Sequence, residues 1–189
     1  MLDLVLNKRS LAVKITVKTT LSVLLIALAF VLPQMTHAIG GAAAGALYMP
    51  MYLPALLAGI LLGWKWGLAV GVLSPAVSYG FTTLALGSAM PNLTRLPYMI
   101  LEIGAYGVVS GLFSKRVQNT PALAFPVVLL AQVSGRVVYL VYNLIAGRDF
   151  SSLWASVQTG MLGLYLQAII VPVVAIILGR ILKNEQKSE

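Results

Sequence analysis

The chain of 189 residues contains no cysteine, one histidine and five acidic residues. The absence of cysteine excludes disulfides, thiolate metal sites and thiol nucleophiles. With so few histidines and acids, a zinc site lacks ligands. The sequence also lacks a G-x-x-x-x-G-K-[ST] loop, so we expect no ATP binding of the P-loop kind. These absences predict a protein that is not an enzyme and that holds no metal or cofactor.

Charged residues are scarce, because 10% of the chain is charged, 59% is hydrophobic and the mean hydropathy is +0.92. Soluble domains contain about 25% charged residues. No residue that is ionised at neutral pH lies between Lys18 and Lys65, between Lys65 and Arg95, or between Asp149 and Arg180. These apolar runs are continuous, whereas a β-barrel has alternating strands of about ten residues. The sequence predicts an all-α membrane protein with several spans.

Six spans fit between the polar, proline and glycine breaks, and they make one transmembrane domain, residues 1–189, with the fold of a six-helix bundle. The predicted spans cover about 12–32, 47–62, 67–85, 96–114, 121–146 and 153–182. A bilayer needs about 20 residues per helix, so the second span is short. We expect Pro33 to end the first span and Pro172 to kink the sixth.

The basic residues predict the orientation, because cytoplasmic loops carry an excess of Lys and Arg. Outer loops are expected at 34–46, 86–95 and 147–152, and only Arg95 and Arg148 fall on that side. The basic residues on the cytoplasmic side are Lys8, Arg9, Lys14, Lys18, Lys65, Lys115, Arg116, Arg180, Lys183 and Lys187. Both termini should be cytoplasmic, and the net charge of +8 is then a topology signal without nucleic-acid binding. No small-residue cleavage site follows the first apolar run, so we expect no removable signal peptide.

Two ionisable residues, Glu102 and Arg136, are predicted inside the membrane, where such groups are costly and are by default functional candidates. At 1.5 Å per residue, both lie in the outer half of their spans, within about one helical turn of the same depth. We expect them to approach each other or a common ligand. Two roles stay open, a structural salt bridge between the fourth and fifth spans or a direct contact with a ligand.

A polar stripe runs along the fifth span, because Gln132, Arg136, Tyr139 and Asn143 follow a 4-3-4 spacing that places them on one helix face. Aromatic rings together with amide and hydroxyl groups suit a flat heteroaromatic molecule. We therefore expect an outward pocket lined by the fourth, fifth and sixth spans and capped by the outer loops. Its predicted substrate-binding residues are Tyr98, Glu102, Arg136, Tyr139, Asn143 and Gln158, with His37 and Asn92 as loop contacts.

Residues 49–59 read MPMYLPALLAG and residues 61–67 read LLGWKWG. Leu73-Ser74-Pro75, Met90-Pro91 and Pro97-Tyr98-Met99 follow, with Glu102 ahead of Tyr106-Gly107. This pattern resembles the S components of energy-coupling factor (ECF) transporters, the vitamin-capturing membrane subunits of bacterial ABC-type importers. The resemblance covers about 20–115 of the chain.

The resemblance implies six helices with both termini inside, an outward substrate pocket in a bacterial cell membrane, and no ATPase in this chain. The partners would be one transmembrane coupling protein and two ATPases. Members dock through small residues of the first helix, for which Ser22, Ala27 and Ala29 are the best candidates here. The favoured substrate is a vitamin or precursor of the B6 or hydroxymethylpyrimidine kind, with cobalamin, niacin, folate and queuosine-type compounds as alternatives.

Two readings of a different class stay open. A six-helix scaffold of cell-shape machinery would share the architecture but lack a polar outward cavity. A stand-alone secondary transporter would couple uptake to an ion through Glu102, although no inverted repeat is visible in the sequence.

Overall fold

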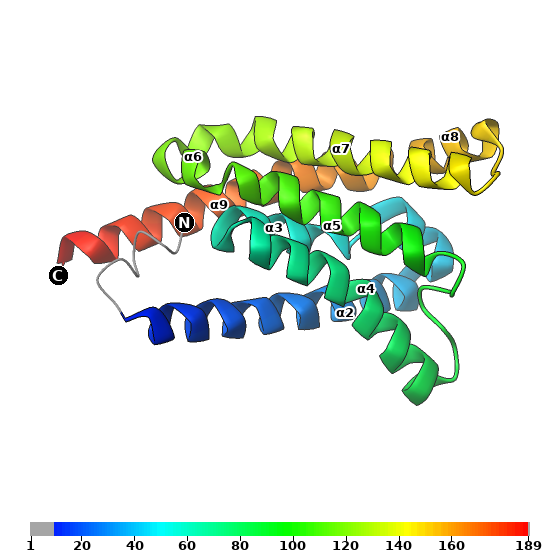
Figure 1. Ribbon diagram of the computed structural model, residues 1–189, viewed down its shortest axis with the longest axis horizontal. Helices are drawn as coiled ribbons and strands as arrows, with labels where there is room; N and C mark the ends of the chain where they lie inside the picture. Colours follow the sequence, from blue (N-terminus) through cyan, green and yellow to red (C-terminus); the bar gives the residue numbers. More distant parts are fainter. Residues whose placement is uncertain (1–9, 189) are drawn as a thin grey trace.

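The computed structural model describes residues 10–188, and every regular element within that range is helical. The predicted all-α class is therefore confirmed. Lys8 and Arg9, two of the residues used to predict the orientation, lie outside the described residues. The elements, shown in Figure 1, are α2 (Leu11–Tyr48), α3 (Tyr52–Leu62), α4 (Trp64–Leu86), α5 (Leu96–Leu112), α6 (Ser114–Asn119), η1 (Pro121–Leu123), α7 (Ala124–Ile145), α8 (Phe150–Thr159) and α9 (Met161–Ser188).

Four helices within the described residues are long and apolar enough to cross a membrane. They are Leu11–Tyr48, Trp64–Leu86, Pro121–Ile145 and Met161–Leu178. The apolar helices α3 and α5 are shorter, with 11 and 17 residues. Nearly every side chain of α3 is buried, so its backbone is surrounded by protein. A helix in that position does not need the length of a lipid-exposed span.

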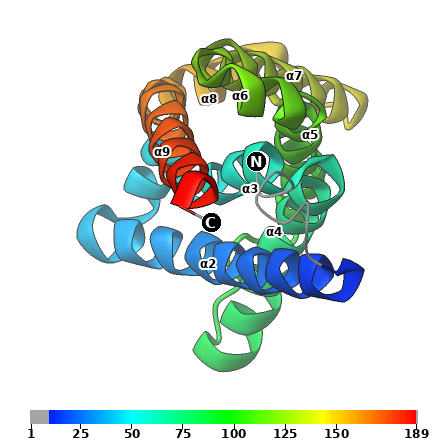
Figure 2. The same cartoon turned by 90° about the vertical axis from the view of Figure 1, so that its left-hand side faces the viewer.

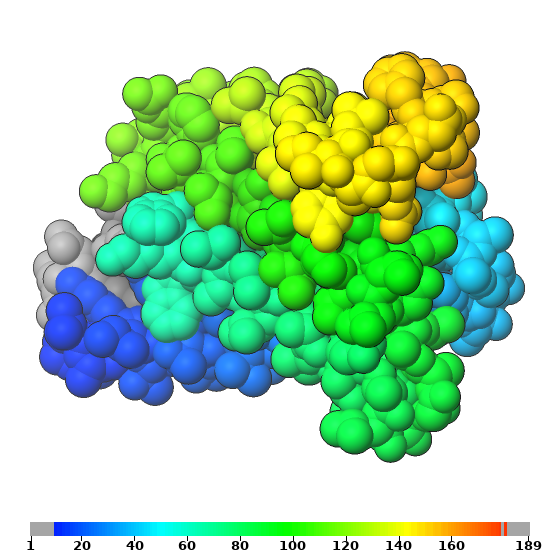
Figure 3. Space-filling model, turned by 45° about the vertical axis from the view of Figure 1, so that its right-hand side comes forward, coloured from blue at the N-terminus to red at the C-terminus, as the bar shows by residue number. Residues whose placement is uncertain are grey.

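Helix α5 holds the bundle together, because it packs against α3, α4 and α7. Figure 2, viewed from one end, shows α3 near the middle with α2, α5, α7 and α9 around it. The shared core contains the fully buried Leu56 and Ile60 of α3, Ile103 and Tyr106 of α5, and Val128 of α7. Helix α2 runs along the outside, and the C-terminal end of α4 projects from the body of the molecule (Figure 3).

Glycines allow α4 and α5 to touch backbone to backbone. A Cβ atom on Gly67 would collide with the carbonyl of Gly107, and a Cβ on Gly107 would collide with that of Gly67. Gly71 stands in the same relation to Ile103. Small residues at this spacing are what close helix packing in a membrane requires. The glycines at every fourth position therefore serve internal packing in this chain.

The expectation that Pro33 ends the first helix is wrong, because α2 continues to Tyr48 with Pro33 inside it. Proline removes one helical hydrogen bond, a loss that helices in membranes tolerate when neighbours and side chains compensate. The helical path is interrupted later, at Gly40 and Gly41, where Gly41 has φ 66° and ψ −162°. Only glycine adopts that conformation readily. Most of the expected outer loop 34–46 is therefore helical.

The expectation of one sixth span at 153–182 is also wrong, because the chain forms α8 and then α9 with Gly160 between them. Asp149 starts α8 as its N-cap, and its carboxylate accepts hydrogen bonds from the Ser151 hydroxyl and the Ser152 backbone N–H. These bonds lower the pKa of Asp149 below its usual value. At the other end of the bundle, the predicted fourth span 96–114 ends at Leu112, and α6 follows as a separate short helix.

Candidate functional site

A cavity of about 520 Å³ opens where α2 ends, α5 begins and α8 follows α7. We call this the distal end of the bundle, because the start of α2 and the C-terminal end of α9 lie at the opposite end in Figure 1. The lining comes from α5, α7, α8 and the α4–α5 loop on one side, and from the end of α2 and the start of α3 on the other. The volume lies within the range of about 300–1,000 Å³ that is typical of small-molecule sites.

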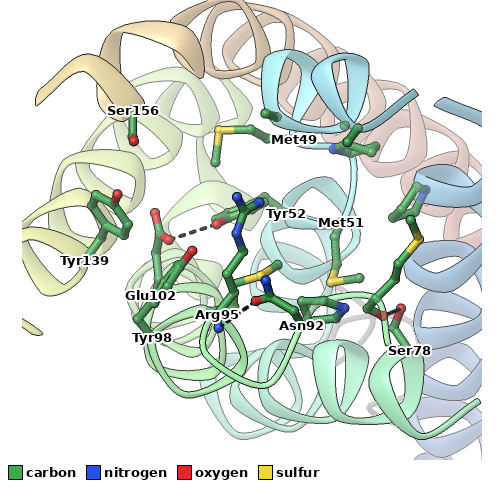
Figure 4. Close-up of a pocket in the computed structure, with 18 of the residues that line it drawn as sticks. Met49, Met51, Tyr52, Ser78, Asn92, Arg95, Tyr98, Glu102, Tyr139 and Ser156 are labelled. Carbon is green, nitrogen blue, oxygen red and sulfur yellow. Dashed lines mark hydrogen bonds between the residues drawn. The ribbon is translucent and has the colours of Figure 1, made fainter. Parts of the chain in front are cut away.

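The Glu102 carboxylate and the Arg136 guanidinium form an ion pair on the inner wall of the cavity. Oε1 of Glu102 lies 3.1 Å from Nη1 of Arg136, with the two side chains 1% and 12% exposed. The predicted approach of these two residues is confirmed. Oε2 of Glu102 accepts a 2.8 Å hydrogen bond from the Tyr52 hydroxyl, as Figure 4 shows. A carboxylate in an apolar interior requires such partners, so α3, α5 and α7 are tied together at this point.

Arg136 uses only part of its hydrogen-bonding capacity within the protein. Its Nη2 donates to the sulfur of Met49 at 2.8 Å, and a thioether is a weak acceptor. Its Nε is buried without a hydrogen-bond acceptor among the described residues. The guanidinium also lies 5.6 Å from the ring centroids of both Tyr52 and Tyr139. A ligand acceptor at this wall would satisfy donors that the protein leaves under-used.

Tyrosine rings make the part of the cavity wall next to the ion pair. Tyr98 and Tyr139 are both buried and pack edge to face, with ring centroids 5.3 Å apart. Both rings line the cavity together with the flexible side chains of Met49, Met51 and Met99. Aromatic faces and polarisable thioethers pack well against a flat ring. The lining therefore combines aromatic and thioether surface with polar and charged groups.

Six of the eight predicted substrate-binding residues line the cavity, namely Tyr98, Glu102, Arg136, Tyr139, His37 and Asn92. The structure does not bring Asn143 and Gln158 there. Asn143 is fully buried and donates from Nδ2 to the backbone carbonyl of Tyr139 at 2.8 Å. Gln158 is exposed on α8, whereas Ser156 and Thr159 of the same helix line the cavity.

The cavity lies partly where we did not expect it. The prediction placed it among the fourth, fifth and sixth spans under the outer loops, and all three spans contribute, the sixth through Ser156 and Thr159 of α8. The turn between α2 and α3, from Met49 to Tyr52, contributes as well and was not expected. His37 lines it from a helix, not from a loop. The side-chain Oδ1 of Asn92 accepts from the backbone N–H of Arg95 and from the Thr94 hydroxyl, so Asn92 also shapes the turn before α5.

Sequence reasoning missed several residues of the lining, including Met49, Tyr52, Arg95 and Arg148. Arg95 and Arg148 were visible as the two basic residues of the expected outer loops, but we used them only as orientation signals. Tyr52 lies inside the motif at 49–59, and no spacing within that motif indicates that its hydroxyl meets Glu102. Only the packing of α3 against α5 reveals that contact.

The small residues proposed for partner docking are divided between the inside and the outside of the bundle. Ser22 is 5% exposed and Ala29 is fully buried, so both face the interior. Ala27 is exposed on α2. A docking surface on this part of α2 would therefore use Ala27 and its exposed neighbours, and Ser22 and Ala29 are excluded from it.

No group of three or more His, Cys, Asp or Glu side chains that could hold a metal ion occurs within residues 10–188. Comparison with protein-family models, curated proteins and solved structures gives no match.

Proposed function

We propose that this protein is the substrate-binding S component of an ECF-type importer in a bacterial cell membrane. It crosses the membrane six times with both termini in the cytoplasm, so the distal end faces outward. It captures a small water-soluble vitamin or precursor there. A separate coupling protein and two ATPases then supply the energy for uptake. Among such compounds, we favour a substrate of the B6 or hydroxymethylpyrimidine kind.

The observation that carries this proposal is the cavity at the distal end with the Glu102–Arg136 pair on its wall. A structural ion pair alone is best surrounded by tightly packed side chains, because unfilled space around it removes stabilising contacts. Here the pair borders a cavity, and Arg136 points one donor at a sulfur. That arrangement suits a site that completes its hydrogen bonds when a ligand enters.

The cavity also favours the proposal over the two alternatives, a scaffold and a secondary transporter. A scaffold of cell-shape machinery has no use for a polar cavity of ligand size. A stand-alone secondary transporter needs a path by which the site alternates between the two faces, and the described cavity is lined by residues of the distal end alone. Ligand capture without turnover fits a site of this kind.

Reconstitution in liposomes tests the proposal. The purified protein should show saturable binding of its ligand and no concentrative uptake until the coupling module and ATP are added. Uptake driven by a proton or sodium gradient in the absence of that module would instead identify a secondary transporter. Absence of any bound small molecule, together with co-purification of cell-shape proteins, would favour the scaffold.

A further inference from the structure

The charged residues that line the cavity are three arginines and one glutamate, which give it a formal net charge of +2. Glu102 is paired with Arg136. The other two arginines, Arg95 and Arg148, form no ion pair and no side-chain hydrogen bond with any residue that the structure describes. The positive charge of these two arginines is thus not balanced by an ion pair within the described part of the chain.

Arg95 and Arg148 come from different loops and converge on the same part of the cavity. Arg95 directly precedes α5, and Figure 4 shows its side chain extending into the cavity. Arg148 follows α7, and its guanidinium lies 5.6 Å from the ring centroid of Tyr98. Tyr98 is one helical turn beyond Arg95, so both arginines are neighbours of this buried ring.

The nearest alternative counter-charge is Asp149, the residue after Arg148. Its carboxylate accepts hydrogen bonds from Ser151 and Ser152 at the start of α8, and it does not line the cavity. In the orientation proposed above, Arg95 and Arg148 are also the basic residues of the outer loops, a side on which Lys and Arg are otherwise sparse. Both of them line the same cavity, whereas a topology signal alone would not require the two arginines to do so.

We propose that the ligand is an organic anion, a small ring compound whose carboxylate or other oxyanion binds between Arg95 and Arg148. The guanidinium group presents a planar fork of donors that matches the two oxygens of a carboxylate. The ring then lies among Tyr98, Tyr139 and the methionines, and a ring acceptor reaches Arg136. This inference rests on the proposed ligand-capturing function and narrows its substrate class to acidic members.

Native mass spectrometry of the full-length protein, purified from its own host without added ligand, gives the first test. We expect a bound molecule that carries an acidic group. A bound molecule without an acidic group overturns this inference and leaves the capture function intact. If no molecule is bound and none of the probes below binds, both the inference and the proposed function are wrong.

Matched probe pairs give the second test, each pair having one ring or chain with and without the negative charge. Nicotinate with nicotinamide, pantothenate with panthenol, and biotin with its methyl ester are titrated calorimetrically into the protein in nanodiscs. For any pair that binds, we expect the anion to bind at least about tenfold more tightly than its neutral partner, because hydrogen bonds to a charged group contribute about that factor to the affinity. Equal affinity for both members overturns the inference.

Four variants test whether the preference for the anionic probe depends on Arg95 and Arg148. Arg95→Gln and Arg148→Gln should each weaken binding of the anion by about tenfold and leave binding of the neutral partner unchanged. Arg95→Lys and Arg148→Lys should retain part of the preference, because they keep the charge and lose the fork. Arg116→Gln on α6, at the opposite end of the bundle, is the matched control and should bind like the unmodified protein. Anion binding that is unchanged in both Gln variants overturns the assignment.

Discussion

The carboxylate of Glu102 and the guanidinium of Arg136 lie 3.1 Å apart, and they join α5 to α7 at the wall of the cavity at the distal end. Their position gives the pair two separable effects. It neutralises two charges that would otherwise be buried alone, and it places in the cavity wall an arginine whose Nη2 has only a thioether as acceptor. The first effect concerns stability, whereas the second concerns ligand binding.

Arg136→Met should destabilise the protein by about 3 to 5 kcal/mol, because it leaves the Glu102 carboxylate buried without its partner. Adding Glu102→Gln should restore at least half of that loss, since no charge then remains. Thermal unfolding in detergent measures both changes. Ligand retention should stay lost in the double variant, and full retention there would assign the pair a purely structural role.

Tyr52→Phe should destabilise the protein by about 1.5 to 3 kcal/mol, because it removes the donor to a buried carboxylate without changing the ring volume. Tyr165→Phe is the control, since Tyr165 is 64% exposed on α9. The melting temperatures of the two variants decide the comparison. Equal values would mean that the Tyr52 hydroxyl contributes nothing to the fold.

Gly107→Ala should separate α4 from α5 and lower the yield of folded protein, because the new Cβ would collide with the backbone of Gly67. We expect a loss of at least about 2 kcal/mol, at the upper end of overpacking effects. Gly80→Ala, also in a helix, meets nothing within 4 Å and should be neutral or stabilising by up to about 1 kcal/mol. A folded, fully stable Gly107→Ala protein would contradict the close packing of these helices.

Ala29→Leu should destabilise the protein by about 1 to 3 kcal/mol, since Ala29 is fully buried in the core. Ala27→Leu should leave the melting temperature unchanged, because Ala27 is exposed on the same helix. If a coupling protein docks on this face of α2, as the proposed function expects, Ala27→Leu should reduce its co-purification with this protein. Undiminished co-purification would move the docking surface away from Ala27.

The sequence by itself determined the all-helical class, the membrane-like composition and the approach of Glu102 to Arg136. Composition decides the first two, because a long apolar run with few charges has few stable alternatives to a helix. The ion pair could be predicted from the sequence, because the rise per residue of a helix gives the depth of each residue in the membrane and a buried charge requires a partner. The inward-facing stripe of Gln132, Tyr139 and Asn143 followed in the same way from the 3.6-residue period.

The tertiary structure alone decided which helices meet at the cavity. Periodicity tells which face of a helix is polar and does not tell which neighbour that face contacts, so the contribution of the start of α3 was not foreseen. Residues 34–46 were expected at the pocket as a loop, and they reach it as the end of α2. Pro33 stays inside α2, and Gly160, between α8 and α9, packs closely against Met49. The local sequence shows neither of these outcomes. Arg95 and Arg148 were plain in the sequence, but their convergence on Tyr98 exists only because two separate loops fold to the same end of the bundle.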